Sequence, residues 1–264
     1  MDVDLKRAAK PAKKLRKLLK SFPANPAPGD VHSLRTQTRR LEAYVHALFA
    51  EDDFEAGKLL KAVKPVRKAA GKVRDMDVLI GKTCTVRVEP EQECMIKLAE
   101  HLAGMRKKYL ERLEKTINRR SSKARKLLRH YLRRMSDGGA TAGERPDRMH
   151  DLAAELERWP KLHAQNLHDF RIHAKELRYM LQLHVHQDRA AIAAFGRIKD
   201  TAGDWHDWVE LEEIARQVLN PETDGVVLKE MHNTVREKLR VALTAANAVR
   251  RHKPLGSPHH SRQA

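Results

Sequence analysis

The sequence has few cysteines, few aromatic residues and no long apolar run. Its two cysteines, Cys84 and Cys94, lack metal-ligand spacing with neighbouring histidines, so we expect reduced thiols and no disulfide framework. No apolar stretch approaches the roughly 18 residues that span a bilayer, and residues 1–20 contain no apolar segment of signal-peptide length. These absences predict a soluble cytoplasmic protein with no membrane partner.

Aromatic residues make up only 5% of the chain, whereas 41% of it is hydrophobic. Alanine and leucine supply most of the hydrophobic fraction, and the strand-forming residues valine, isoleucine, tyrosine and phenylalanine are comparatively sparse. This composition predicts a mostly helical protein. The length of 264 residues allows one large domain or two small ones.

Positive charge is the strongest feature of the composition. The chain contains 53 Lys and Arg against 35 Asp and Glu, a formal net charge of +18 before its 15 histidines are counted. A charge this far from neutral implies a polyanionic partner or an acidic surface.

Two stretches, residues 31–41 and 167–177, share the pattern apolar-His-x-x-Arg-x-x-x-cation-x-Leu. In a helix, positions three and seven residues after the histidine return to nearly the same face as the histidine itself. The resulting cationic stripes are His32, Arg35 and Arg39 in the first stretch and His168, Arg171 and Lys175 in the second. Like charges stacked in this way destabilise an isolated helix, so we expect a polyanion to neutralise them.

Apolar periodicity, capping residues and helix breakers divide the chain into helices. The expected helices cover residues 5–20, about 31–48, 55–80, 91–135 (one helix or two), 148–158, about 160–186, a further helix from about 190, and about 226–251. Asp30 is expected to cap the second helix, and Pro65 to kink or restart the third. Trp159-Pro160 is expected to begin the helix that carries the second histidine stretch.

Residues 136–147 are rich in turn-forming residues, lack apolar periodicity and lie near the midpoint, which predicts a linker. We therefore expect a single domain over residues 1–264, with an N-terminal helical bundle at 1–135 and a C-terminal helical bundle at 148–251. The tail at 252–264 is expected to be disordered.

The chain contains an internal repeat. The two histidine stretches align at an offset of 136 residues, and residues 71–75 (Gly-x-x-Arg-Asp) align with residues 203–207 (Gly-x-x-His-Asp) at an offset of 132. Two ordered matches at nearly one spacing predict a duplicated all-α unit, two antiparallel four-helix bundles related by approximate two-fold symmetry. Such a pairing would bring both cationic stripes near one axis, where they would line a shared groove.

Four motifs occur in order along the chain. They are His-x-x-Arg-x-x-x-Arg-Arg-Leu from residue 32, Gly-x-x-Arg-Asp-x-Asp-Val from 71, Leu-His-x-x-Arg-Ile-x-x-Lys-x-Leu-Arg-Tyr from 167, and Ile-Lys-Asp-Thr-Ala-Gly-x-x-x-Asp from 198. From about residue 5 to 251 the chain resembles the CHAD domain, the conserved histidine α-helical domain. The resemblance implies two four-helix bundles whose basic central surface binds inorganic polyphosphate, often beside polyphosphate-metabolising enzymes or on polyphosphate granules.

The resemblance also implies a set of ligand contacts. Carried over by motif, these are His32, Arg35, Arg39, Arg40, His168, Arg171, Lys175 and Arg178. Glu176 stands at the position that pairs with Arg40, and Glu42 at the position that pairs with Arg178, so the two halves are not equally basic there. The two histidines are expected to raise affinity below about pH 6.5, where imidazole gains its charge.

Further cations extend the predicted polyphosphate-binding set. Between residues 106 and 134 there are thirteen Lys and Arg against two Glu, and several of them share a narrow arc of the helix. Together with the charged side of residues 55–80, this adds Lys64, Lys68, Arg74, Arg119, Lys123 and Lys126.

Several other functions compete with polyphosphate binding. Nucleic acid is the main one, because any basic groove attracts it, although aromatic residues for base stacking are few and no nucleic-acid-binding motif is recognised. A polyphosphate hydrolase would need a metal-binding carboxylate cluster or an activated nucleophile, and the sequence shows neither. A role as accessory or scaffold of a polyphosphate-metabolising enzyme stays open. We expect a non-catalytic binding protein without cofactor or metal.

Overall fold

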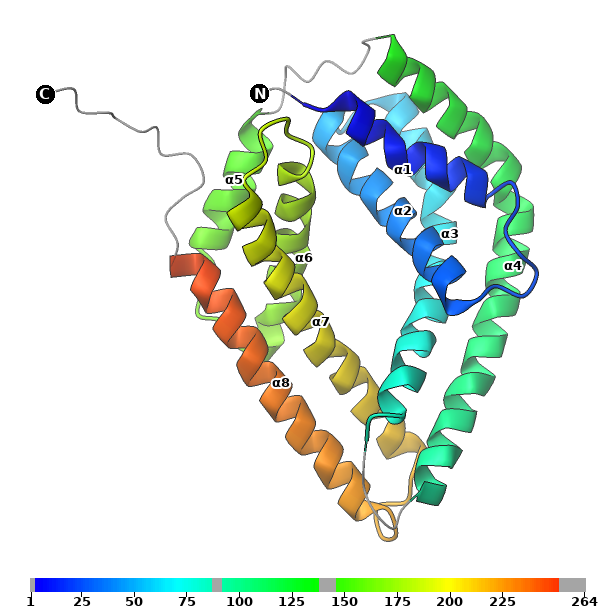
Figure 1. Cartoon of the computed structure of the whole chain (residues 1–264), viewed down its shortest axis with the longest axis vertical. Helices are drawn as coiled ribbons and strands as arrows, with labels where there is room; N and C mark the ends of the chain where they lie inside the picture. Colours follow the sequence, from blue (N-terminus) through cyan, green and yellow to red (C-terminus); the bar gives the residue numbers. More distant parts are fainter. Residues whose placement is uncertain (1–2, 87–91, 138–145, 252–264) are drawn as a thin grey trace, which may run out of the picture.

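The computed structural model describes residues 3–86, 92–137 and 146–251. They form eight α-helices and one isolated β-bridge, between Val3 and His184 (Figure 1). The helices are α1 (Leu5–Leu18), α2 (Pro28–Leu48), α3 (Phe54–Thr83), α4 (Gln92–Ser136), α5 (Pro146–Glu157), α6 (Ala164–Leu181), α7 (Arg189–Val218) and α8 (Gly225–Arg251). The predicted all-α fold is confirmed in this part of the chain.

Helices α1 to α4 pack around one apolar core. Leu15 of α1, Leu34 and Leu41 of α2, Val66 of α3 and Leu128 of α4 are fully buried in it. Apolar residues recur at three- and four-residue steps in each helix and so share one face, which turns toward this core. Helix α3 runs through Pro65 without a second start, and α4 is one helix of 45 residues.

Helices α5 to α8 enclose a second core, in which Phe170, Leu177, Ile198, Ala242 and Ala246 are fully buried. The arrangement fits the expected pair of four-helix bundles, which Figure 1 shows side by side. The long helices also continue beyond their own bundles and pack on one another in a third apolar cluster. Its members include Met76, Leu79, Leu98, Leu102, Leu211 and Met231.

The two halves therefore meet at two places with a polar region between them. At one place Tyr179 of α6 and Leu183 just after it pack into the core of the first bundle. At the other, the third apolar cluster joins α3 and α4 to α7 and α8. Between these contacts the facing parts of α2, α3, α6 and α7 carry charged side chains.

Three predicted helix starts are corrected by the structure. Helix α2 begins at Pro28, because proline fits the first turn of a helix, and Asp30 accepts a hydrogen bond from the Ala27 N–H at 2.9 Å from inside that turn. Helix α5 begins at Pro146, two residues before the expected start. Trp159 and Pro160 do not begin α6, which starts at Ala164. The Asn166 side chain caps this start by accepting a hydrogen bond from the His163 N–H at 2.9 Å.

The predicted linker and tail lie mostly outside the described residues. Ser136 belongs to α4, and Pro146 and Asp147 belong to α5, so the segment between the two bundles is shorter than expected. The segments 138–145 and 252–264 are not described. None of the described helices combines the length and the apolar character that crossing a membrane requires.

Candidate anion-binding site

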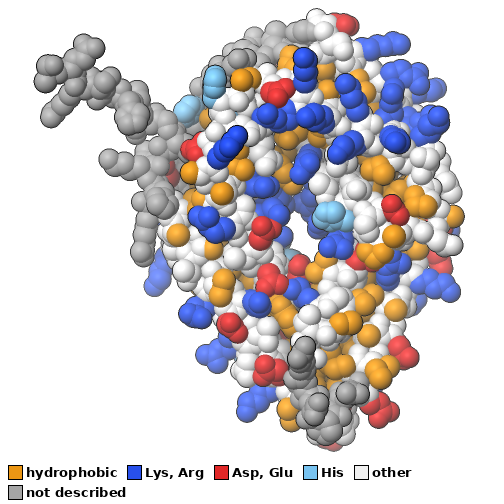
Figure 2. Space-filling model, in the orientation of Figure 1, with side chains coloured by type: hydrophobic (Ala, Val, Ile, Leu, Met, Phe, Trp, Pro, Cys, Tyr) orange, Lys and Arg blue, Asp and Glu red, His pale blue; other side chains and the backbone are white. Residues whose placement is uncertain are grey.

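The two histidine stretches lie on α2 and α6, which pack against each other at the junction of the bundles. The apolar residues of each motif face its own core, since Leu34 and Leu41 of α2 and Phe170 and Leu177 of α6 are fully buried. The cations of the motif therefore point away from the cores, toward the junction. Figure 2 shows that this face of the molecule is hollowed at its centre, with Lys and Arg side chains gathered in and above the hollow.

Five cations from three helices form what we call the cationic centre. They are Arg35 and Arg39 of α2, Arg67 of α3, and Arg171 and Lys175 of α6. Burial, followed by the charges of the four arginines, lowers the pKa of Lys175 to about 7. The fold thus brings the cationic stripes of both halves into one cluster.

The cations of the cationic centre lower one another's pKa values. Burial and the charges of Arg35 and Arg67 lower the pKa of Arg39 to about 10. Burial also lowers the pKa of Arg171, although Asp207 acts in the opposite direction. Holding like charges together away from water costs folding free energy, which an anion bound among them would offset.

Several donors in this region have no acceptor. The Nε atoms of Arg35, Arg39 and Arg40 are buried and lack a hydrogen-bond partner among the described residues, as does Nδ1 of His168. Buried polar groups in native proteins nearly always have partners. Oxygen atoms of a bound anion would supply the missing acceptors.

Each half holds one arginine between a glycine and an aspartate of the neighbouring helix. In the first half Arg35 forms an ion pair with Asp75 at 3.4 Å and lies beside Gly71. In the second half Arg171 lies against Gly203 so closely that a Cβ atom there would be 2.8 Å from its Nη2. The aligned Gly and Asp of the sequence repeat therefore shape the surroundings of the two arginines.

The surroundings of both motif histidines lower the pKa of the imidazole. Burial and the neighbouring charges of Arg74 and Arg35 lower the pKa of His32. Burial and then His206, whose ring centroid lies 4.8 Å away, lower the pKa of His168. Without a bound anion, these histidines therefore become charged at a pH below the expected value of about 6.5.

An acidic layer lies next to the cationic centre on the side of the third apolar cluster. Burial raises the pKa values of Asp207 and Glu210 on α7, and the charge of Asp75 on α3 acts on both in the same direction. Asp204 of α7 is the partner of Lys82, an ion pair that links the two halves. An anion would be attracted to the cationic centre and repelled by this acidic layer, so it would bind on the cationic side of the junction.

Three more predicted residues, Arg40, Arg74 and Arg178, belong to the same three helices as the cationic centre. The charges of Arg74 and Arg40 act on the His32 imidazole, so both are near it. The Arg178 Nε donates to the Ile192 carbonyl at 3.3 Å, which turns this side chain toward the start of α7. Arg40 and Arg74 therefore lie beside His32, whereas Arg178 is directed toward α7.

The remaining predicted residues are exposed. Lys64 and Lys68 are exposed on α3, in the same turns as Arg67. Arg119, Lys123 and Lys126 are exposed on α4, which packs on α1 and α3 and forms the outer edge of the first bundle in Figure 1. The structure does not bring these three to the cationic centre.

Sequence reasoning missed three basic residues of the site. Arg67 is paired with Glu42 at 3.1 Å and belongs to the cationic centre. Lys199 acts on His32 from the opposite half, and His206 contacts His168. The repeat offset of 132 residues relates Arg67 to Lys199 and would have identified both as candidates.

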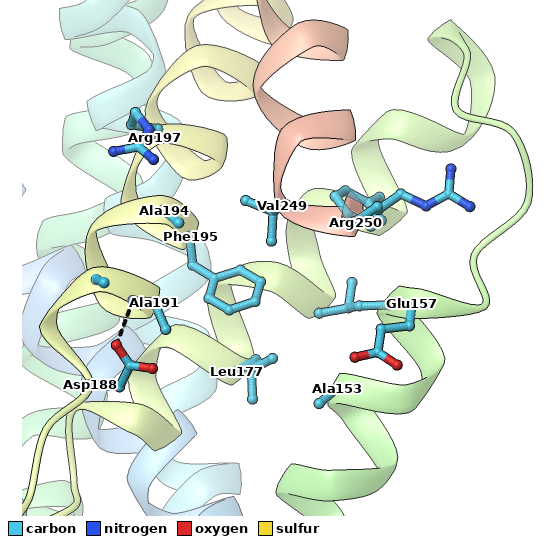
Figure 3. A pocket seen from close by; sticks show the side chains of 13 residues that line it. Ala153, Glu157, Leu177, Asp188, Ala191, Ala194, Phe195, Arg197, Val249 and Arg250 are labelled. Carbon is cyan, nitrogen blue, oxygen red and sulfur yellow. Dashed lines mark hydrogen bonds between the residues drawn. The ribbon is translucent and has the colours of Figure 1, made fainter. Parts of the chain in front are cut away.

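A separate cavity of about 290 Å³ lies inside the second bundle (Figure 3). Its wall is mostly apolar, with Phe170 and Phe195 as its largest apolar side chains, and Arg250 lies at its edge. None of the predicted binding residues lines it. Among the residues that the structure describes, no group of three His, Cys, Asp or Glu side chains could hold a metal ion.

Fold and site together define an all-helical protein with a partly buried cluster of cations at the junction of its halves. A sequence model of the CHAD domain matches residues 7–216, so the chain belongs to the CHAD domain family. The crystal structure of the CHAD domain from the plant Ricinus communis is similar over 97% of this chain and 96% of that one, with a TM-score of 0.65 and 16% sequence identity. No curated protein matches the chain.

Proposed function

We propose that this protein binds inorganic polyphosphate, without catalysing a reaction, in the hollow at the junction of its two bundles. The observation that carries the proposal is the cationic centre, in which five Lys and Arg from α2, α3 and α6 lie close together. Nearby guanidinium groups have buried donors without acceptors among the described residues. The family resemblance names polyphosphate as the anion.

Polyphosphate suits this arrangement better than other polyanions do. It is a flexible thread with about one negative charge per phosphate and no bases, so its receptor needs cations at repeated spacing and no stacking surface. Arginine can donate to two oxygen atoms at once, which fits a phosphate group. The cations of both halves would then hold successive phosphates of one thread.

The cellular role follows from binding alone. A protein that holds polyphosphate would associate with polyphosphate granules or present the polymer to an enzyme that makes or degrades it. The proposal excludes catalysis by this chain. Sustained phosphate release from polyphosphate with added Mg²⁺ or Mn²⁺ would contradict it.

Calorimetric titration tests the binding proposal. Long-chain polyphosphate is titrated in parallel with single-stranded DNA and RNA of matched charge, at one salt concentration. We expect polyphosphate to bind at least about tenfold more tightly than either nucleic acid, which corresponds to about 1.4 kcal/mol. Equal or tighter binding of nucleic acid would make this a nucleic-acid-binding protein.

A matched pair of variants locates the site. The double substitution Arg39→Gln and Lys175→Gln removes one cation from each half of the cationic centre, and we expect roughly 100-fold weaker polyphosphate binding. The control, Lys229→Gln with Arg240→Gln, removes two exposed cations from α8 and should change affinity less than about threefold. Equal losses in both variants would show that net charge, and not this site, governs binding.

A further inference from the structure

A second basic surface lies outside the junction, on α1 and α4. Helix α1 contains seven Lys and Arg and no acidic residue. The exposed ones in and just after this helix are Lys6, Lys10, Lys13, Lys14, Arg16, Lys17 and Lys20. Steps of three and four residues place five of them, Lys6, Lys10, Lys13, Lys17 and Lys20, on one stripe.

Helix α4 continues this surface, because it packs directly against α1. Between Arg112 and Arg133 it has nine Lys and Arg against one acid, Glu114. The exposed cations are Arg112, Lys115, Arg119, Lys123, Lys126, Arg129 and Arg133. At 1.5 Å per residue this row is about 32 Å long. Figure 2 shows Lys and Arg side chains gathered over α1 and the adjoining part of α4.

We call these exposed cations of α1 and α4 the outer basic face. None of them has an ion-pair partner in the part of the chain that the structure describes. The apolar side of α1 is occupied, since Ala8, Ala12 and Leu15 are fully buried in the first core. Helix α1 therefore has no free apolar side to insert into a membrane, and the face offers charge alone.

We propose that the outer basic face binds a second polyphosphate chain, so that one protein molecule bridges two chains. The outer basic face shares no helix with the cationic centre, which is built from α2, α3 and α6. A flexible thread held at the junction leaves the exposed rows on α1 and α4 free to hold another thread. This proposal rests on polyphosphate binding at the junction and adds a second contact.

The two surfaces differ in the kind of attraction they provide. The outer basic face is exposed and rich in lysine, so salt screens it strongly. The cationic centre is partly buried and rich in arginine, so its attraction is screened less. Bridging should therefore disappear at a salt concentration at which binding at the junction persists.

Light scattering tests bridging with the variant Lys13→Gln, Lys17→Gln, Arg119→Gln and Lys123→Gln. Wild-type protein mixed with long-chain polyphosphate should form large assemblies, and scattering should fall when either component is in excess. In the variant we expect scattering to fall by about tenfold or more, because each molecule then holds one chain. Scattering equal to that of the wild type would overturn the proposal.

Binding of tripolyphosphate distinguishes a loss of bridging from a loss of binding at the junction. It is too short to bridge, and calorimetry should show that the outer-face variant binds it within about twofold of the wild type. Loss of tripolyphosphate binding in this variant would assign the outer residues to the first site and overturn a second one. Bridging of single-stranded DNA but not of polyphosphate by the wild-type protein would make nucleic acid the ligand of the outer basic face.

Discussion

The two halves of the cationic centre are built from the same sequence pattern and differ in chemistry. The first half supplies arginines, and its Arg35 is held by an ion pair with Asp75. The second half supplies Lys175, whose pKa lies at about 7, and packs Arg171 against Gly203. The comparison shows that a repeat can preserve helix positions while one half keeps a permanent charge and the other gains a charge that depends on pH.

The largest expected difference between the halves concerns Arg39 and its counterpart Lys175. Arg39→Gln should weaken tripolyphosphate binding by about 10- to 100-fold at pH 8, since hydrogen bonds to charged groups contribute about 1.5 to 3 kcal/mol. Lys175→Gln should cost less at this pH, because the lysine has already lost most of its proton in the free protein. Calorimetry at pH 8 compares the two variants, and a larger loss for Lys175→Gln would contradict the assignment.

The next prediction compares the two glycines. Gly203→Ala places a Cβ atom 2.8 Å from Arg171 Nη2, so the guanidinium must move, and we expect about tenfold weaker polyphosphate binding. Gly71→Ala is the matched control, because its Cβ atom would lie 3.9 Å from the nearest atom, Arg35 Nε. Alanine favours a helix over glycine by about 1 kcal/mol, so the control should be folded and bind normally. Similar affinities for both variants would show that Arg171 is not positioned by Gly203.

A smaller effect is expected from pH. Lys175 has a pKa of about 7 in the free protein, and a bound polyanion favours its charged form, so binding takes up a proton. Affinity should therefore fall by several-fold, less than about tenfold, as pH rises from about 6 to 8.5. Lys175→Arg keeps its charge over this range and should flatten the profile. If Lys175→Arg kept the full pH dependence, His32 or His168 would be the group responsible for it.

The smallest effect concerns stability without ligand. Lys175 has a lower pKa in the folded protein than its ordinary 10.5, so the unfolded chain binds more protons between about pH 7 and 10.5. The contribution of Lys175 to the free energy of unfolding should therefore rise with pH across this window. Lys175→Met, which removes the charge, should raise the melting temperature at pH 7 by a few degrees, with thermal denaturation as the measurement. A lower melting temperature would mean that the lysine stabilises the free protein.

The sequence predicted the helices well because their apolar periodicity was strong. The ends of the helices expected at 226–251 and 91–135 agree with those of α8 and α4 to within one residue. The start of α6 was missed because a proline after tryptophan is typical of a first helical turn. In the structure the Asn166 side chain accepts a hydrogen bond from the His163 N–H, and the helix begins only at Ala164. Helix starts depend on such single hydrogen bonds, which periodicity does not report.

The candidate site was predicted in part. The stripes on α2 and α6 could be recognised from spacing alone, since histidine and cations at offsets of three and seven share a helix face. Arg67 was missed because it belongs to neither motif, although the repeat relates it to Lys199. Arg119, Lys123 and Lys126 share a helix face as expected, but that face points outward.

The sequence by itself determined the all-α fold and the face of each helix that carries charge, because these depend on periodicities within one helix. Only the tertiary structure decided which charged faces come together. The packing of α2 against α6 and the third apolar cluster hold the junction, so Arg39 and Lys175 lie near each other although 136 residues separate them in the sequence. That proximity, and the burial that accompanies it, lowers the pKa of Lys175 to about 7.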